Sequence, residues 1–359
     1  MARIALVGFP NVGKTTLFNA LTGLSVPTAP HPFSTTEPNV GMAVVPDPEL
    51  DRAAVVEGSR KTVHATLELE DLPALARPGH GGGLGARFLG RLRETEALAV
   101  VLRAFDDPGV PATESGLDPA AQAEELGLEL VLADAEVFAR RAEKIAKEAT
   151  ADPARKRAAQ AVAEAAALLE SGRPLRARDW DEEALAAFRD LAPLTLKPAV
   201  WVVNIGEAEP DPAARVAGVA AVVPAGDEVL ALSARLEEEA ARLDPDDRAE
   251  LFAGLGLGEG ALARMVAASY AALGLASFYT LGPKEAHAWT VRRGAGAREA
   301  AGKIHTDLER GFIRAEVGRL DEVTAAGGWD AAKAAGLTRV EGRDYEVQEG
   351  DVLLIRFSV

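Results

Sequence analysis

Eight residues near the N-terminus have the types and spacing that bind nucleotide phosphates. The run from Gly8 to Thr15 reads Gly-Phe-Pro-Asn-Val-Gly-Lys-Thr and matches G-x-x-x-x-G-K-[ST]. Such glycines let consecutive backbone N–H groups face an anion at a helix N-terminus. Lys14 is expected to hold the β- and γ-phosphates, and Thr15 to offer its hydroxyl to Mg²⁺. The predicted phosphate-binding residues are Asn11, Val12, Gly13, Lys14, Thr15 and Thr16.

Two later segments supply candidates for the metal ion and the γ-phosphate. Asp71 ends a short apolar run, where a carboxylate can bind Mg²⁺ through water, and Thr35 and Thr36 lie in a proline-rich loop that can close over the γ-phosphate. Alone, an acid at a strand end or a polar turn is common. Their order behind the phosphate motif indicates a site, so we expect Thr15, Thr35 and Asp71 near the metal ion.

Short apolar runs bounded by turn residues must position this chemistry. They are typical of central strands in a sheet covered on both faces, and helical stretches separate several of them. This alternation predicts a doubly wound α/β domain. The expected strands are Arg3 to Phe9, Val63 to Leu69, Ala97 to Phe105, Ala199 to Val203 and Val229 to Leu232.

A segment rich in Ala, Glu, Arg and Leu interrupts the alternation from about Asp118 to Leu191. Its apolar spacing and the break at Pro153 predict an antiparallel pair of helices that packs along a seam. The seam is expected to comprise Leu126, Leu130, Ala133 and Val137. A basic cluster near the tip is either a site for nucleic acid or a solvated face paired with glutamates. Its candidate RNA contacts are Arg140, Arg141, Lys144 and Lys147.

Composition limits the classes of protein that remain. The 39 basic and 55 acidic residues give a net charge of −16, so any contact with a polyanion must be local. The lack of cysteine excludes disulfides, thiolate catalysis and cysteine-ligated zinc. No run of about 18 apolar residues occurs, so we expect no membrane-spanning helix and a cytoplasmic protein. The last eighty or so residues predict a separate small α+β module.

Several further segments resemble the YchF group of Obg-like ATPases, which are P-loop nucleoside triphosphatases of the translation-factor class. The resemblance spans essentially the whole chain and implies a nucleotide-binding domain at 1–117 and 195–275, a helical coiled-coil insertion at 118–194, and a ubiquitin-like TGS domain at 276–359. The segments that carry it, besides the phosphate motif, are Pro32 to Gly41, Arg93 to Ala97, Asn204 to Glu207, Lys284 to Thr290, Ala300 to Asp307, Gly311 to Glu316 and Glu341 to Tyr345.

The base-binding segment departs from the Asn-Lys-x-Asp of guanine-binding relatives. Here Ile205 replaces the lysine, and Glu207 is one methylene longer than the aspartate that accepts two hydrogen bonds from guanine. The resemblance associates this variant with ATP, and we expect ATP to be preferred over GTP. The expected base-binding residues are Asn204, Ile205, Glu207, Ser233, Ala234 and Arg235.

Other departures touch the expected switch residues. Ala74 stands where the family has the glycine that senses the γ-phosphate, and Leu75 stands at the place of a catalytic glutamine. The family's histidine after the third strand is missing, which leaves His80 as a substitute candidate or a plain surface residue. Asn11 matches the position that helps to hold K⁺ in potassium-dependent relatives. We therefore expect binding to persist and hydrolysis to be slow, ribosome-stimulated or lost.

The resemblance favours a monomeric, ribosome-associated switch that binds ATP with Mg²⁺ and K⁺ and contacts ribosomal RNA. Two alternatives are a hydrolysis-impaired scaffold, which the switch departures favour, and a GTP-specific translation GTPase. A metabolic kinase would need a lid with arginines. Its candidates, Arg87, Arg91 and Arg93, look more like one charged face of a helix.

Overall fold

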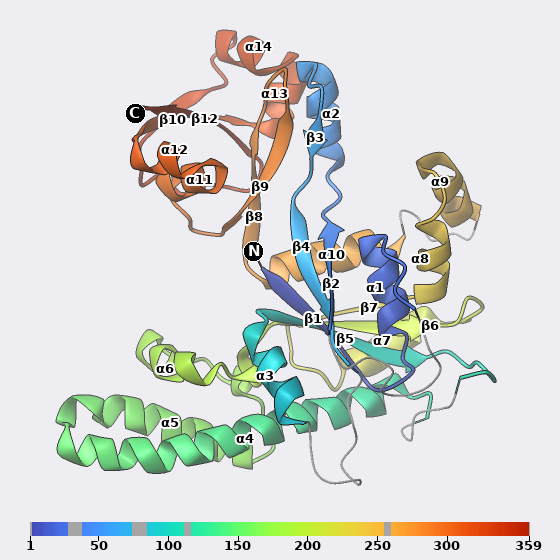
Figure 1. The fold of residues 1–359 in the computed structure, drawn as a ribbon, viewed down its shortest axis with the longest axis vertical. Coiled ribbons are helices and arrows are strands. Elements are labelled where there is room, and N and C mark those ends of the chain that lie inside the picture. The colour runs from blue at the N-terminus through green and yellow to red at the C-terminus, as the bar shows by residue number, and fades with distance from the viewer. Residues whose placement is uncertain (1, 28–37, 74–84, 111–115, 255–259, 359) are drawn as a thin grey trace. The chain divides into compact units, whose positions relative to one another are not determined.

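The structure, a computed structural model, describes residues 2–27, 38–73, 85–110, 116–254 and 260–358. The chain divides into two compact units, and each is described by itself (Figure 1). Unit 1 comprises Met1–Met42 and Glu68–Met265, and unit 2 comprises Ala43–Leu67 and Val266–Val359.

The first unit is built on a six-stranded sheet in the order β2-β4-β1-β5-β6-β7. Strands β4, β1, β5, β6 and β7 are parallel neighbours. All eight residues of β5 are buried, which suits a strand covered on both faces. The strands are β1 (Arg3–Val7), β2 (Asn39–Val44), β4 (Thr66–Asp71), β5 (Ala97–Ala104), β6 (Ala199–Ile205) and β7 (Glu228–Leu232). The predicted doubly wound α/β class is confirmed.

Helices connect these strands, and several begin at an aspartate or serine that accepts a backbone hydrogen bond, as Asp118, Asp181, Asp211 and Ser233 do. The helices are α1 (Lys14–Thr22), α3 (Ala86–Glu94), α4 (Pro119–Ala151), α5 (Lys156–Glu170), α6 (Glu182–Phe188), α7 (Pro212–Ala220), α8 (Ala234–Ala240), α9 (Pro245–Gly254) and α10 (Ala261–Ala272), the last of which crosses the division between the units. Short 3₁₀ turns occupy Pro153–Arg155, Leu175–Ala177, Arg189–Leu191 and Leu194–Leu196.

The predicted helical hairpin is formed by α4 and α5, which lie side by side in Figure 1. Its core contains Phe138, whose ring meets that of Phe188 at 5.2 Å, edge to face. The predicted seam is right only in part. Leu126 and Leu130 are buried, but Ala133 and Val137 are half-buried because the buried stripe continues through Asp134 and Phe138 instead.

The second unit is an α+β module with a six-stranded sheet in the order β11-β10-β12-β8-β9-β3. Apolar clusters cover it, one of them including α2, α13 and α14 and the other α11. The helical stretch from Ala297 to Arg310 is interrupted at His305, whose backbone is extended and whose ring accepts from Asp307 N–H. The elements are α2 (Pro48–Glu57), β3 (Thr62–Val63), β8 (Leu275–Thr280), β9 (Ala286–Arg292), α11 (Ala297–Ile304), α12 (Thr306–Arg310), β10 (Phe312–Arg319), α13 (Leu320–Ala326), α14 (Trp329–Ala334), β11 (Arg339–Glu341) and β12 (Asp351–Phe357).

The segment Ala43–Leu67 differs from the boundaries expected from the sequence, because it lies with the C-terminal residues rather than with the phosphate motif. Strand β3 pairs in parallel with β9, through Thr62 opposite Ala286. Leu50 of α2 is fully buried in a cluster with Tyr279 and Trp329. None of the described helices combines the length and apolar character needed to cross a membrane.

Candidate nucleotide-binding site

The predicted site residues gather where the parallel strands of unit 1 end. Val7, Asp71 and Ile205 are the last residues of β1, β4 and β6. In open α/β sheets this carboxyl edge is where ligands bind. Parallel pairing places Leu6 opposite Asp71, so the phosphate loop after β1 starts beside that acid.

The phosphate loop has the backbone of an anion cradle. Asn11 has φ +62° and Gly13 has φ +95°, which turns successive peptide groups toward one side. A Cβ at Gly13 would lie 2.3 Å from the side-chain nitrogen of Asn204, so only glycine fits there. Val12 is buried, Thr16 is half-buried, and α1 begins at Lys14.

Lys14 lies inside this loop with 7% of its surface exposed. Its ammonium donates to the carbonyl oxygens of Gly8 and Phe9, both at 3.0 Å. Burial lowers the pKa of Lys14 to about 8, although the charge of Asp71 acts to raise it. A phosphate would return a counter-charge to this buried amine.

Thr15 and Asp71, which are both expected near the metal ion, lie in contact. The Thr15 hydroxyl donates to Asp71 Oδ2 at 2.8 Å, and Asn39 donates to the same oxygen at 3.4 Å. Asp71 Oδ1 is buried, and no residue in the described ranges donates a hydrogen bond to it. Burial raises the pKa of Asp71, against the Thr15 hydrogen bond and the Lys14 charge. An unpartnered buried carboxylate oxygen beside a hydroxyl suits a hydrated divalent cation.

Asn204 ties the phosphate loop to the loop after β7. Its side chain is 5% exposed, donates to the Val12 carbonyl at 2.9 Å and accepts from Ala234 N–H at 2.9 Å. Ser233 caps α8 by accepting from Leu236 N–H. Three predicted base-binding or phosphate-binding segments are therefore joined through one amide.

Glu207 lies in the loop after β6, three positions beyond Asn204, and Arg235 lies in the first turn of α8. Arg235 Nε lies 3.6 Å from Glu207 Oε1 and 3.2 Å from Glu239 Oε1. Both partners of the first pair are exposed, and Ile205 is half-buried at the end of β6. The structure thus brings together a carboxylate and a guanidinium where the sequence predicted base recognition.

Five predicted residues lie outside the part of the chain that the structure describes. They are Thr35, Thr36, Ala74, Leu75 and His80.

The basic cluster on the hairpin is partly neutralised. Arg140 pairs with Glu136 at 2.6 Å, and Arg141 pairs with Glu148 at 3.3 Å. Lys144 and Lys147 are exposed, and neither forms an ion pair with any residue in the described ranges. The solvated-face interpretation fits the two arginines, which leaves two lysines with free charge.

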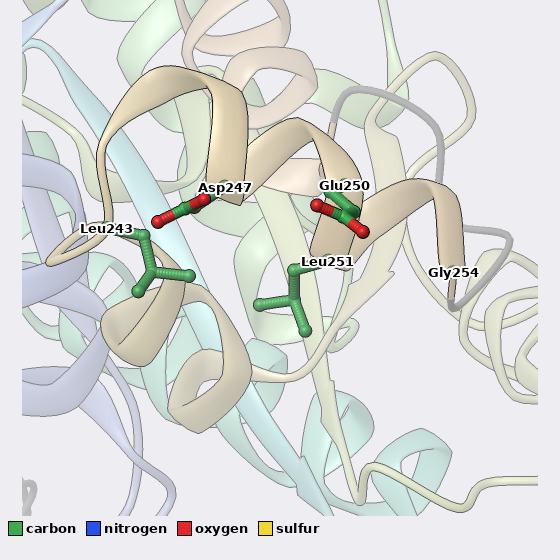
Figure 2. A pocket seen from close by; sticks show the side chains of 5 residues that line it. All are labelled: Leu243, Asp247, Glu250, Leu251 and Gly254. Carbon is green, nitrogen blue, oxygen red and sulfur yellow. The ribbon is translucent and has the colours of Figure 1, made fainter.

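Asn39 was missed by sequence reasoning, although it stands just after the Thr35–Thr36 loop. The hydrogen bond from its side-chain amide to Asp71 could be found only from the tertiary structure. Among the described residues, no group of three histidine or acidic side chains forms a metal cage. A hollow along α9 shares no residue with the site, and its lining of Leu243, Asp247, Glu250, Leu251 and Gly254 includes two acids that suit no phosphate (Figure 2).

Comparison with known families and structures agrees with this geometry. Residues 3–151 match the family described as 50S ribosome-binding GTPase, and residues 275–358 match the YchF-GTPase_C family, described as a protein of unknown function. A solved structure described as the YchF GTPase of Schizosaccharomyces pombe superimposes with a TM-score of 0.86 and 28% identity, and covers 99% of this chain and 97% of that one.

Curated relatives match over nearly the same length. The Ribosome-binding ATPase YchF of Escherichia coli O157:H7 is 40% identical, over 99% of each chain. That of Bacillus subtilis is 38% identical, over 99% of this chain and 98% of its own. Obg-like ATPase 1 of Oryza sativa subsp. japonica is 35% identical, over 99% of this chain and 92% of its own.

Proposed function

This chain belongs to the YchF family of Obg-like ATPases, and from that premise we propose that it is a ribosome-associated switch that binds ATP with Mg²⁺ and hydrolyses it slowly. One observation carries the proposal: buried Lys14, the Thr15–Asp71 pair and the bridging side chain of Asn204 all lie at the same edge of the sheet. Lys14 is suited to bind the phosphate charge, and the Thr15–Asp71 pair is suited to bind a hydrated cation. Asn204 holds the loop that is expected to face the base.

The residues fit Mg²⁺, which would be held by Thr15 and, through water, by Asp71. The buried Oδ1 of Asp71 has no hydrogen bond to any described residue, and we propose that it binds such a water. When bound, the cation would neutralise charge on the phosphate oxygens. We add K⁺ to the proposal because Asn11, the matching position of potassium-dependent relatives, lies in this loop at φ +62°.

The protein's own residues bind and orient the phosphates. When a phosphate binds, Lys14 would exchange its two carbonyl acceptors for the phosphate oxygens, which are stronger acceptors. Backbone N–H groups of the loop would supply further donors. Slow hydrolysis is proposed from the sequence departures at Ala74 and Leu75 and from the missing histidine. His80 is the candidate that would orient water, and its replacement by alanine should lower turnover without lowering ATP affinity.

Ribosome association is proposed from the relatives' names and from the hairpin. Lys144 and Lys147 are the side chains with charge to spare for ribosomal RNA, whereas Arg140 and Arg141 are already paired. We propose that it acts in the cytoplasm, where such a partner would be found, and that it acts as a monomer.

Calorimetric titration of ATP and, separately, GTP into nucleotide-free protein with Mg²⁺ and K⁺ tests the proposal. We expect ATP to bind more tightly, and Lys14→Ala to abolish binding of both. Tighter GTP binding would favour a GTP-specific translation GTPase. Tight ATP binding with no turnover, with or without ribosomes, would favour the hydrolysis-impaired scaffold, and no binding of either nucleotide would overturn the proposal.

A further inference from the structure

The contact between Glu207 and Arg235 points to the means by which the base is chosen. We infer that Arg235 sets the nucleotide preference by occupying one oxygen of the Glu207 carboxylate, so that the pair presents one acceptor and one donor to the base. The inference rests on the proposed function and assigns to Arg235 the specificity that a longer carboxylate alone does not secure.

The geometry places both side chains at the rim of the same site. Ala234 N–H, next to Arg235, bonds to Asn204, which stands three positions before Glu207. Because that amide is buried, the two loops hold a fixed spacing, and the 3.6 Å contact between Arg235 Nε and Glu207 Oε1 spans them. The side chains themselves are exposed and open to a ligand.

Glu239 contacts the same guanidinium. It lies one helical turn after Arg235 on α8, and its Oε1 accepts from the same Nε atom at 3.2 Å. Arg235 therefore contacts two carboxylates, one from the loop after β6 and one from its own helix. A guanidinium carries five N–H donors in a planar fork, so donors remain after both contacts are made.

The chemistry of the purine edges explains the consequence. Guanine presents two neighbouring donors, N1–H and the 2-amino group, which require two acceptors such as both oxygens of a free carboxylate. Adenine presents one donor, the 6-amino group, beside one acceptor, N1. A carboxylate with one oxygen engaged by a guanidinium offers one acceptor and an adjacent donor, which complements adenine and leaves a guanine donor unpaired.

Glu207 alone would discriminate poorly. Its side chain is 54% exposed and one methylene longer than aspartate, so a free carboxylate there has rotamers that can turn both oxygens toward guanine. The ion pair with Arg235 at 3.6 Å favours the rotamers that keep Oε1 beside the guanidinium. The expected penalty for one unpaired donor is a several-fold loss of affinity.

A double-mutant cycle on nucleotide affinity tests the inference. ATP and GTP are titrated into the wild type, Arg235→Ala, Glu207→Ala and the double variant, all as the full chain. We expect Arg235→Ala to weaken ATP and strengthen GTP, with the ratio of the two affinities shifting roughly tenfold toward GTP. In the Glu207→Ala background the same substitution should leave the ratio unchanged, because Arg235 acts through that carboxylate.

Arg242→Ala is the matched control, because Arg242 is an exposed arginine just after α8 that pairs with Glu238 at 3.0 Å. It should leave the ratio unchanged. An unchanged ratio in Arg235→Ala, an equal shift in Arg242→Ala, or a shift that persists without Glu207 would each overturn the inference while leaving ATP binding intact. A wild type that binds neither nucleotide would instead overturn the proposed function, and this inference with it.

Discussion

Lys14 links the pH of the solution to phosphate binding. Its pKa of about 8 in the free protein should rise when a phosphate supplies a counter-charge, so the complex favours the protonated amine. ATP affinity should therefore be highest below pH 8 and decline as the pH rises above 8. At pH 8 we expect uptake of about half a proton per ATP, measured from calorimetric enthalpies in buffers of different ionisation enthalpy.

Lys14→Arg is the control for that experiment, since arginine stays protonated across this range. If it takes up as many protons as the wild type, Lys14 is not the group that titrates.

Asn204 should matter to both stability and binding. Asn204→Ala leaves the Val12 carbonyl and the Ala234 N–H without their partner in a buried place, which should cost about 2 kcal/mol of unfolding free energy in urea. ATP affinity should fall roughly tenfold because the loops lose their spacing.

Gln122→Ala is a matched control for Asn204→Ala. Gln122 is a buried amide that bonds both backbone groups of Arg103 on β5. It should cost similar stability with a smaller loss of ATP affinity. Equal losses of affinity in the two variants would show that Asn204 has no special part in binding.

The sequence predicted those site residues whose roles follow from their position next to a strand. The phosphate motif and Asp71 could be assigned because the motif directly follows a strand and Asp71 ends one. Asn39 and the bridging geometry of Asn204 could not, since their partners lie 32 and 192 positions away. The structure places the Thr15 hydroxyl 2.8 Å from Asp71 Oδ2, while the metal-binding roles of both residues and the roles of the switch residues stay predictions.

A buried ion pair joins α3, which follows the expected switch, to the helical hairpin. Asp134 of α4 is fully buried, and accepts from Arg93 at 2.9 Å and from the backbone N–H groups of Leu194 and Thr195. Asp134→Ala should cost about 3–5 kcal/mol, because it strands the Arg93 charge and the two N–H groups. Urea unfolding measures the loss.

Asp134→Asn, which keeps an acceptor, should cost less than Asp134→Ala and covers the case in which the alanine variant does not fold. Glu136→Ala on the same helix breaks only the exposed pair with Arg140 and should change stability by less than about 1 kcal/mol. Similar losses at Asp134 and Glu136 would contradict this reading of the ion pair.

Lys197 lies at the same junction and donates to the Arg93 and Thr95 carbonyls. Burial lowers its pKa to about 8, with the Arg93 charge acting in the same direction. The unfolded chain therefore binds more protons than the folded chain between pH 8 and about 10, so stability should rise with pH there. We expect the rise from pH 7 to pH 9 to be larger in the wild type than in Lys197→Met, by urea unfolding. Lys14 has the same sign but is present in both proteins and cancels.

Element boundaries were predictable wherever the local pattern was complete. Four of the five expected strand regions coincide with single strands, but Val63 to Leu69 is divided between β3 and β4, which belong to different sheets. The break at Pro153 separates the hairpin helices. The observed hairpin seam differs from the predicted one because an aspartate is normally expected on the solvent side of a helix, whereas Asp134 is buried. The place of β3 could not be predicted, since a two-residue strand carries no signal of which sheet it joins.

At the scale of the whole molecule, a net charge of −16 makes ribosome binding depend on a local basic surface. Replacing Lys144 and Lys147 together by glutamine should reduce co-sedimentation with ribosomes. The plot of log affinity against log salt concentration should also become less steep, by the amount expected for the loss of about two phosphate contacts. Replacing Arg140 and Arg141 should have a smaller effect, because glutamates already pair with them. Unchanged sedimentation of the lysine variant would remove the hairpin from the interface.

The second unit is assembled from two distant stretches of chain, which has a consequence for biosynthesis. Ser59 donates to the Gly282 carbonyl across 223 positions, and Leu50 has its partners Tyr279 and Trp329 still farther along. During translation, α2 and β3 emerge long before the strands that cover them. At about 5–20 residues per second the nascent chain exposes the buried face of α2, formed by Leu50, Ala53 and Ala54, for ten seconds or more, so the unit closes only near the end of synthesis.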